Sequence, residues 1–301
     1  MMHKLISIVI RTLNEEKYLN ELITEIKNQI IENLEYEIVI IDSGSTDKTL
    51  EIAKEHGCRI TFISKKDFSF GKSLNMGSEY ANGDILVYVS GHCIPSSTQW
   101  LNELVRPIIY GHAGYSYGGQ LGKETTKFSE KQIFKKYFPK ESEVPQKGFF
   151  CNNANSAISR EVWKKYLFNE EITGLEDMEL AKRYVDDGGK IAYVFNASVF
   201  HIHDETWKQT RRRYERESFA LQEIMPDLQV SLWDTWRYIL VGINSDLLEA
   251  YKNKSFFKNF LSIIFFRTAQ YFGSYRGNKL NKQISDTRKE AYFYPKTKFR
   301  E

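Results

Sequence analysis

Apolar and polar segments alternate regularly along the first third of the chain. Short β-branched runs at 6–10, 37–41, 60–63 and 85–89 predict strands. The segments between them have apolar residues at helical spacing and predict helices over 18–31, 45–56 and 72–82. Strands that alternate with helices in this way favour an α/β fold with a mainly parallel central sheet and right-handed crossovers. Ligands of such sheets bind beyond the carboxyl ends of the strands.

The pattern changes in the second half of the chain. Helical spacing predicts helices over 100–109, 161–165 and 175–187, and strand character is seen at 111–122, 191–195 and 198–200. The charged segment 123–148 is interpreted as a loop or lid with some helix. Three aromatic-rich helices are expected over 204–225, 233–251 and 255–271. We therefore predict one α/β domain over 1–205 and a helical C-terminal extension over 206–301.

Composition narrows the class of protein. The 301 residues are 42% hydrophobic and 27% charged, which is typical of a globular protein. A net charge of +3 gives no indication of nucleic-acid binding. Three isolated cysteines do not form a disulfide framework, and the first apolar run is too short for a secretion signal or a membrane span. We expect a cytoplasmic protein.

The loop Asp42-Ser43-Gly44-Ser45-Thr46-Asp47 follows the second predicted strand. Its carboxylates could bind ribose hydroxyls, and its amides could bind an anion. The alternative is a turn that caps the next helix through Ser45 or Thr46. Neither GxGxxG nor GxxxxGK[ST] is present, so the strand ends do not indicate NAD or ATP chemistry.

The two strand ends together are more specific. The runs IVIRTLNEEKYL and YEIVIIDSGSTDKT resemble the opening of family 2 glycosyltransferases with the GT-A nucleotide-sugar fold. This resemblance implies that the donor nucleotide binds at Thr12, Asn14, Glu15 and Asp42. Asp47 also matches the pattern, as a donor contact or only as a helix cap.

The following block, FSFGKSLNMGSEYANGDILVYVSGHCIP, resembles the next part of the family pattern and adds Lys72, Asn75 and Ser90 to the expected donor site. Here the sequence departs from the family, because Ser90-Gly91-His92 replaces the usual Asp-x-Asp metal motif. An imidazole binds Mn, Zn, Fe or Co but suits Mg poorly. His92 is interpreted either as a metal ligand or as a hydrogen-bonding residue of the site.

His201 and His203 are separated by one residue, so in a strand they would share a face. The resemblance places a metal-binding histidine at this position. We therefore expect a divalent metal on His92, His201 and His203, with Mn²⁺ preferred to Mg²⁺. The alternative is a metal-independent site in which histidines or Arg211 stabilise the leaving group.

Glu176 and Asp177 open a predicted helix, where acids stabilise the helix dipole. The resemblance implies a catalytic role instead, with Asp177 as the general base for the acceptor hydroxyl and Glu176 beside it. The run NNANSAIS resembles the acceptor-side loop of the family and offers Asn152, Asn153, Asn155 and Ser156, although a structural turn explains it nearly as well.

These observations predict an inverting glycosyltransferase. FSFGKSLNMG, YVSGHCIP and GLEDMELAKR are most similar to a rhamnosyltransferase-like branch, which implies a UDP- or dTDP-linked donor and a saccharide or lipid-linked saccharide acceptor in surface polysaccharide assembly. One rival is a non-catalytic nucleotide-sugar or glycan-binding protein on the same fold. A nucleotidyltransferase is a weaker rival, because 11–16 is not a glycine- and lysine-rich phosphate loop.

The helical extension carries basic and aromatic residues. Of the three consecutive arginines at 211–213, we expect Arg211 to reach the diphosphate. The remaining basic and aromatic residues indicate a peripheral contact with the inner face of the cell membrane, a homodimer interface or simple helix packing.

Overall fold

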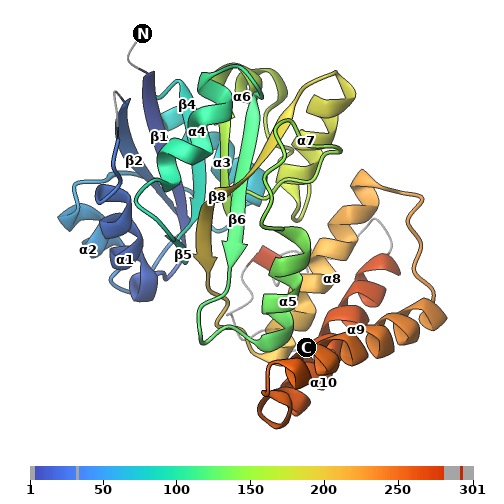
Figure 1. The fold of residues 1–301 in the computed structure, drawn as a ribbon. Coiled ribbons are helices and arrows are strands. Elements are labelled where there is room, and N and C mark those ends of the chain that lie inside the picture. Colours follow the sequence, from blue (N-terminus) through green and yellow to red (C-terminus); the bar gives the residue numbers. More distant parts are fainter. Residues whose placement is uncertain (1–3, 32–33, 281–291, 294–301) are drawn as a thin grey trace. The chain divides into compact units, whose positions relative to one another are not determined.

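A computed structural model describes residues 4–31, 34–280 and 292–293 (Figure 1). The chain forms two compact units. Within the described residues, the first consists of the chain up to Lys123, Phe134–Glu171 and Glu176–Ile202. The second consists of Glu124–Ile133, Ile172–Leu175 and the chain from His203 onward.

The first unit is built on an eight-stranded sheet with the order β3-β2-β1-β4-β7-β6-β8-β5. The strands are β1 (Lys4–Thr12), β2 (Leu34–Asp42), β3 (Arg59–Phe62), β4 (Ile85–Ser90), β5 (Cys93–Pro95), β6 (Tyr115–Leu121), β7 (Asn155–Ser159) and β8 (Ile191–His201). Strands β1 to β4 are mutually parallel, and β6 is parallel to β8. Antiparallel pairing enters through β7, between β4 and β6, and through β5 at the edge beside β8. The predicted α/β class is confirmed, with a sheet that is mixed beyond β4.

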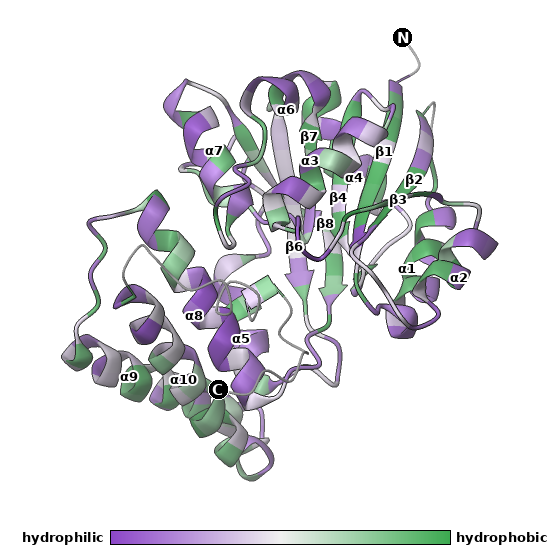
Figure 2. Cartoon of the chain, turned by 180° about the vertical axis from the view of Figure 1, so that it is seen from behind, coloured by the Kyte–Doolittle hydropathy of each residue, from purple (hydrophilic) through white to green (hydrophobic). Residues whose placement is uncertain are grey.

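Helices cover both faces of this sheet. They are α1 (Glu16–Lys27), α2 (Thr49–Glu55), α3 (Phe70–Tyr80), α4 (Trp100–Ile109), α6 (Arg160–Tyr166) and α7 (Glu176–Asp186). Helix α5 (Phe128–Tyr137) begins in the second unit and enters the first at Phe134. One core includes Ile8 and Ile10 with α1 and α4, and the other includes Val9 with α3 and α7. Figure 2 shows β1 as a mainly hydrophobic strand. Its alternate residues supply both cores, and each fully buried aliphatic side chain contributes roughly 1.5–3 kcal/mol.

Two predicted helices are shorter than their patterns suggested. Helix α1 ends at Lys27 rather than at residue 31, because the chain turns away and the Ile30 N–H donates to the Thr98 carbonyl at 2.9 Å. Helix α2 begins at Thr49 rather than Ser45, and its N-cap residue is Lys48. Strand β5 was not predicted, and the segment expected as two strands at 191–195 and 198–200 is the single strand β8.

The second unit contains α8 (Trp207–Ile224), α9 (Leu232–Lys252) and α10 (Phe256–Asn278). Glycines allow α10 to approach α8 closely, since a Cβ atom on Gly277 would lie 2.1 Å from the Glu215 carbonyl oxygen. A buried ion pair joins α9 to α10, with Arg267 nitrogens 2.7 Å from both carboxylate oxygens of Asp246. Among the helices described, none is both long and apolar enough to cross a bilayer.

Candidate functional site

The candidate site begins at the carboxyl ends of three neighbouring parallel strands. β1 lies between β2 and β4, and the register pairs Thr12 with Asp42 and Arg11 with Ser90. The parallel arrangement therefore brings three of the predicted donor-binding positions to one edge of the sheet.

Asp42 organises the loop that follows β2. Its Oδ1 atom accepts hydrogen bonds from the N–H groups of Gly44 (2.9 Å) and Ser45 (2.8 Å). Its Oδ2 atom accepts from the Thr12 hydroxyl (2.8 Å) and the Ser45 hydroxyl. Gly44 has φ +99°, a conformation that other residues rarely adopt. The buried carboxylate thus fixes the shape of the loop.

Asn14 joins this loop to the end of β1. Its side-chain oxygen accepts from the Thr46 N–H at 2.8 Å, and its own N–H donates to the Ser45 hydroxyl at 2.9 Å. Ser45 and Thr46 therefore do not cap α2, contrary to expectation. Asp47 precedes the N-cap residue Lys48, and its Oδ1 atom accepts from the N–H of Thr49, the first residue of α2, at 3.0 Å.

Glu15 lies against the Ser90-Gly91-His92 turn. The His92 Nδ1 atom is 3.0 Å from Glu15 Oε1. A Cβ atom on Gly91 would lie 2.8 Å from the Glu15 side chain, so a glycine is needed for this approach. The turn that lacks its own carboxylate therefore has one beside it from the β1–α1 loop.

The three predicted metal ligands come together. One ligand atom from each of His92, His201 and His203 lies within 4.8 Å of the others, and the rings of His92 and His201 stack at 5.2 Å. The expectation that His201 and His203 share a strand face was wrong, because β8 ends at His201 and His203 lies beyond it.

Each histidine has an oxygen atom beside its Nδ1 atom. His201 is 2.7 Å from Gln120 Oε1, and His203 is 2.8 Å from Glu130 Oε1. Because these oxygens only accept, as does that of Glu15, Nδ1 carries the proton of each neutral ring. The lone pair is then on Nε2, the tautomer that such outer-shell oxygens impose on metal-binding histidines. Gln120 and Glu130 were not found from the sequence, because they lie far from the histidines along the chain.

Asp177 and Glu176 occupy the first turn of α7 and are both buried. Asp177 Oδ2 accepts from the Asn153 N–H at 2.8 Å, and Oδ1 accepts from the Met178 N–H at 2.8 Å. Burial and then the neighbouring Glu176 charge raise the pKa of Asp177 to about 7. A carboxyl group with this pKa suits proton abstraction near neutral pH.

Arg11 connects the acid pair to the strand ends, and sequence reasoning missed it. Its guanidinium lies 3.2 Å from Glu176 Oε1 and also donates to the Phe70 carbonyl at 3.2 Å. Its positive charge lowers the pKa of Asp177, against the larger effects of burial and Glu176. The position of Arg11 at the carboxyl end of a buried strand, next to the predicted donor-binding residue Thr12, was the available signal.

The predicted acceptor-side loop packs beneath Asp177. The Asn153 side-chain oxygen accepts from the hydroxyls of Tyr115 (2.6 Å) and Ser156 (2.7 Å). Its Nδ2 atom is buried and has no hydrogen-bond partner among the described residues. Asn155 is fully committed to the fold, since it bonds Trp100, Gly119 and Ala197.

The remaining predicted donor residues differ in their surroundings. The Asn75 side chain bonds the backbone of Phe168 in both directions, as well as Glu170 and Trp163, so it holds α3 to that segment. Lys72 lies in the first turn of α3, where its N–H donates to the Ser69 hydroxyl. Ser90 ends β4 beside Arg11.

The three arginines of α8 are not equivalent. Arg213 is buried and pairs with Glu130 at 2.7 Å and Glu205 at 3.0 Å, which gives it a structural role. Arg211 has a buried Nε atom without a hydrogen-bond partner in the described part of the chain. Arg211 therefore differs from Arg213, whose guanidinium is held by two carboxylates.

Comparisons with known proteins identify the family. The family model for glycosyl transferase family 2 matches residues 7–167. The chain is 27% identical over 222 residues to the O-antigen chain rhamnosyltransferase RfbN of Salmonella typhimurium, covering 69% of this chain and 70% of that protein. It is 29% identical over 197 residues to WbaN of Salmonella anatum, with the same description, covering 59% of this chain and 60% of that one.

A solved structure shows the same fold. The mannosyltransferase PcManGT from Pyrobaculum calidifontis, in complex with GDP-Man and Mn²⁺, superposes with a TM-score of 0.64 at 14% identity. The match covers 91% of this chain and 86% of that one. The chain therefore has the GT-A fold and belongs to glycosyl transferase family 2.

Proposed function

We propose that the protein transfers a hexosyl or deoxyhexosyl group from a UDP- or dTDP-linked donor to a saccharide or lipid-linked saccharide during surface polysaccharide assembly. The observation that carries this proposal is the position of the buried Glu176–Asp177 pair, which Arg11 ties to the strand ends of the donor loops. The similarity to two O-antigen chain rhamnosyltransferases supports a deoxysugar donor and a polysaccharide product.

In the proposed reaction, Asp177 acts as the general base. Its carboxylate takes the proton of an acceptor hydroxyl while the hydroxyl oxygen forms a bond to the anomeric carbon of the donor sugar. The bond from that carbon to the diphosphate breaks, and the nucleoside diphosphate leaves with the electron pair. Attack opposite the leaving group inverts the anomeric centre. Glu176, held by Arg11, flanks the base and orients the acceptor.

The histidine cluster fits a divalent transition ion better than Mg²⁺. Three neutral imidazoles form a ligand set that suits Mn, Fe, Co or Zn, and their Nδ1 atoms are held by acceptor oxygens. His92, His201 and His203 would hold the ion, which would neutralise charge on the leaving diphosphate. Arg211 is the candidate to supply positive charge from the protein itself.

Replacing Asp42 tests the donor site. Asp42→Ala leaves the N–H groups of Gly44 and Ser45 without their acceptor, so the loop loses its shape. We expect calorimetry with UDP- and dTDP-sugars to show at least tenfold weaker binding, about 1.4 kcal/mol. Asp84→Ala is the matched control, because Asp84 accepts from Leu5 N–H at the opposite edge of the sheet. Unchanged affinity in Asp42→Ala would mean that the loop is only a structural turn.

Replacing Arg11 tests the electrostatics of the acid pair. Arg11→Leu removes a positive charge that lowers the pKa of Asp177. The acidic limb of the kcat/KM profile, near pH 7 in the wild-type protein, should then move roughly one unit towards alkaline pH. Arg11→Lys keeps the charge and should restore most of the profile. An unshifted limb in Arg11→Leu would show that another group titrates in the rate.

A further inference from the structure

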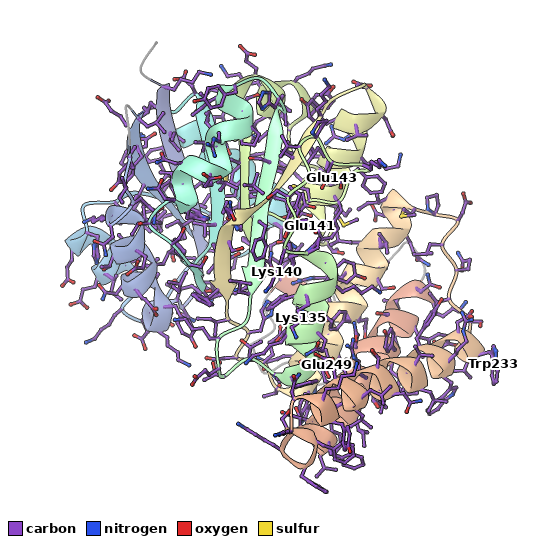
Figure 3. The ribbon with its side chains drawn as sticks, viewed as in Figure 1. Lys135, Lys140, Glu141, Glu143, Trp233 and Glu249 are labelled. Atoms are coloured by element: carbon purple, nitrogen blue, oxygen red, sulfur yellow. The ribbon has the colours of Figure 1, made fainter. Side chains whose placement is uncertain are left out.

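The second unit exposes a set of large apolar side chains along α9 and the start of α10. It includes Trp233, Leu240, Leu248 and Tyr251 of α9, and Phe257 and Leu261 of α10; we name these six residues the α9–α10 face. Trp233 is 77% exposed, Tyr251 74% and Phe257 95%. Figure 2 shows hydrophobic segments along both helices, and Figure 3 shows Trp233 projecting outward from the first turn of α9. Exposure of so many large apolar residues indicates an interaction surface.

Helix geometry places the α9 members of this set on one side of the helix. Trp233, Leu240 and Tyr251 are separated by seven and eleven residues, close to two and three whole turns. The opposite side of α9 is buried through Thr235, Ile239, Gly242, Asp246 and Ala250. The helix therefore has one side that is buried within the unit and an opposite side whose large aromatic and aliphatic residues are exposed.

The exposed charges that accompany this face are mostly positive. Between residues 236 and 265, all of which are described, the exposed charged side chains are Arg237, Lys252, Lys254 and Lys258. Of the acids of α9, Asp246 is buried against Arg267, and Glu249 is partly exposed. Asp234, beside Trp233, is also partly exposed and lies 3.5 Å from Arg237. The apolar face is thus bordered by positive charge, most densely at the turn between α9 and α10.

We infer that the α9–α10 face binds an anionic lipid bilayer. An interfacial helix buries Trp, Phe and Leu at the acyl boundary while Lys and Arg contact anionic headgroups, and this face offers both. A second copy of the chain fits less well, because a twofold contact through the face would bring two lysine clusters together, and the acids of α9 that could offset them, Asp234 and Glu249, are only partly exposed. This inference does not depend on the proposed reaction, since lipid binding is measured without donor or acceptor.

Vesicle sedimentation tests the inference. The full chain should sediment with phosphatidylcholine vesicles that contain phosphatidylglycerol, much less with phosphatidylcholine alone, and less as salt rises. The triple variant Lys252→Gln, Lys254→Gln, Lys258→Gln should bind roughly a hundredfold more weakly, about fivefold for each lysine. Phe257→Ser should weaken binding about tenfold or more, and its 95% exposure makes a folding defect no concern.

Matched variants separate this face from general surface charge. Lys54, Lys140 and Lys164 are exposed lysines of the first unit, and changing all three to Gln removes the same charge. Tyr110, an aromatic residue of the first unit that is 64% exposed, provides Tyr110→Ser as the control for Phe257→Ser. Equal losses in face and control variants would overturn the inference. It would also be overturned by no binding to anionic vesicles at low salt, or by a solution dimer that Phe257→Ser dissociates in the absence of lipid binding.

Discussion

Asp177→Asn is expected to lower the rate of glycosyl transfer by about 10² to 10⁴ while donor affinity stays within a few fold. The substitution removes the atom that takes the acceptor proton. It leaves the donor loops unchanged, because the Asp177 carboxylate accepts its hydrogen bonds from the N–H groups of Asn153 and Met178, which lie outside those loops. Transfer to a defined acceptor and calorimetry with the donor measure the two quantities separately.

The stability of this variant distinguishes a catalytic loss from a folding defect. The pKa of Asp177 is raised from 3.8 to about 7, so the folded protein holds this proton more tightly than the unfolded chain does. Stability therefore falls as pH rises between these values, and the penalty of burying the charge is fully present above pH 7. Asparagine removes this penalty but loses one accepted hydrogen bond. We expect the melting temperature to stay within a few degrees of wild type at alkaline pH.

A matched substitution on the same helix provides the control. Asp186→Asn changes an exposed acid at the other end of α7, where its partner is Lys182 at 2.6 Å. Its transfer rate should be that of the wild-type protein. Near-normal turnover by Asp177→Asn would refute the assignment of the base, and a rate loss that accompanies a large fall in melting temperature would point to a structural role.

His92→Ala is expected to have the second large effect. If His92, His201 and His203 hold the ion, loss of one imidazole should weaken Mn²⁺ binding by more than the roughly 10- to 100-fold that loss of an outer-shell partner causes. Glu15→Ala should produce that smaller effect, because Glu15 holds His92 through Nδ1. Mn²⁺ titration by calorimetry and the Mn²⁺-induced rise in melting temperature measure both without any turnover.

The chelator EDTA links the ion to the reaction. Wild-type transfer should fall on treatment and return with Mn²⁺ more fully than with Mg²⁺. His112→Ala is the control for His92→Ala, since His112 is exposed and its ring is tilted against that of Tyr110, with 6.2 Å between the centroids. A wild-type rate that EDTA leaves unchanged would refute the metal site, and attention would then move to Arg211 as the group that stabilises the leaving diphosphate.

The sequence by itself determined the α/β class and the loops that matter. The hydrophobic pattern is sufficient to predict a strand that is buried on both faces, such as β1, β2 or β4, because these strands are short apolar runs. The family resemblance of the strand ends was confirmed by the family model over 7–167. The acid pair at 176–177 and the three histidines were named from the sequence, and their roles stay predictions.

Only the tertiary structure showed which distant residues contact the acid pair and the histidines. Arg11 meets Glu176 across 165 residues, and Glu130 meets His203 across 73. The start of a helix also depended on hydrogen bonds outside it. Ser45 donates its N–H to Asp42 in the loop, and α2 begins at Thr49 instead of Ser45. Local patterns record which side chains are buried, because burial repeats with the period of the helix or strand. They do not show which distant group lies beside a buried carboxylate or imidazole. That contact sets the pKa of the carboxylate and the tautomer and orientation of the imidazole.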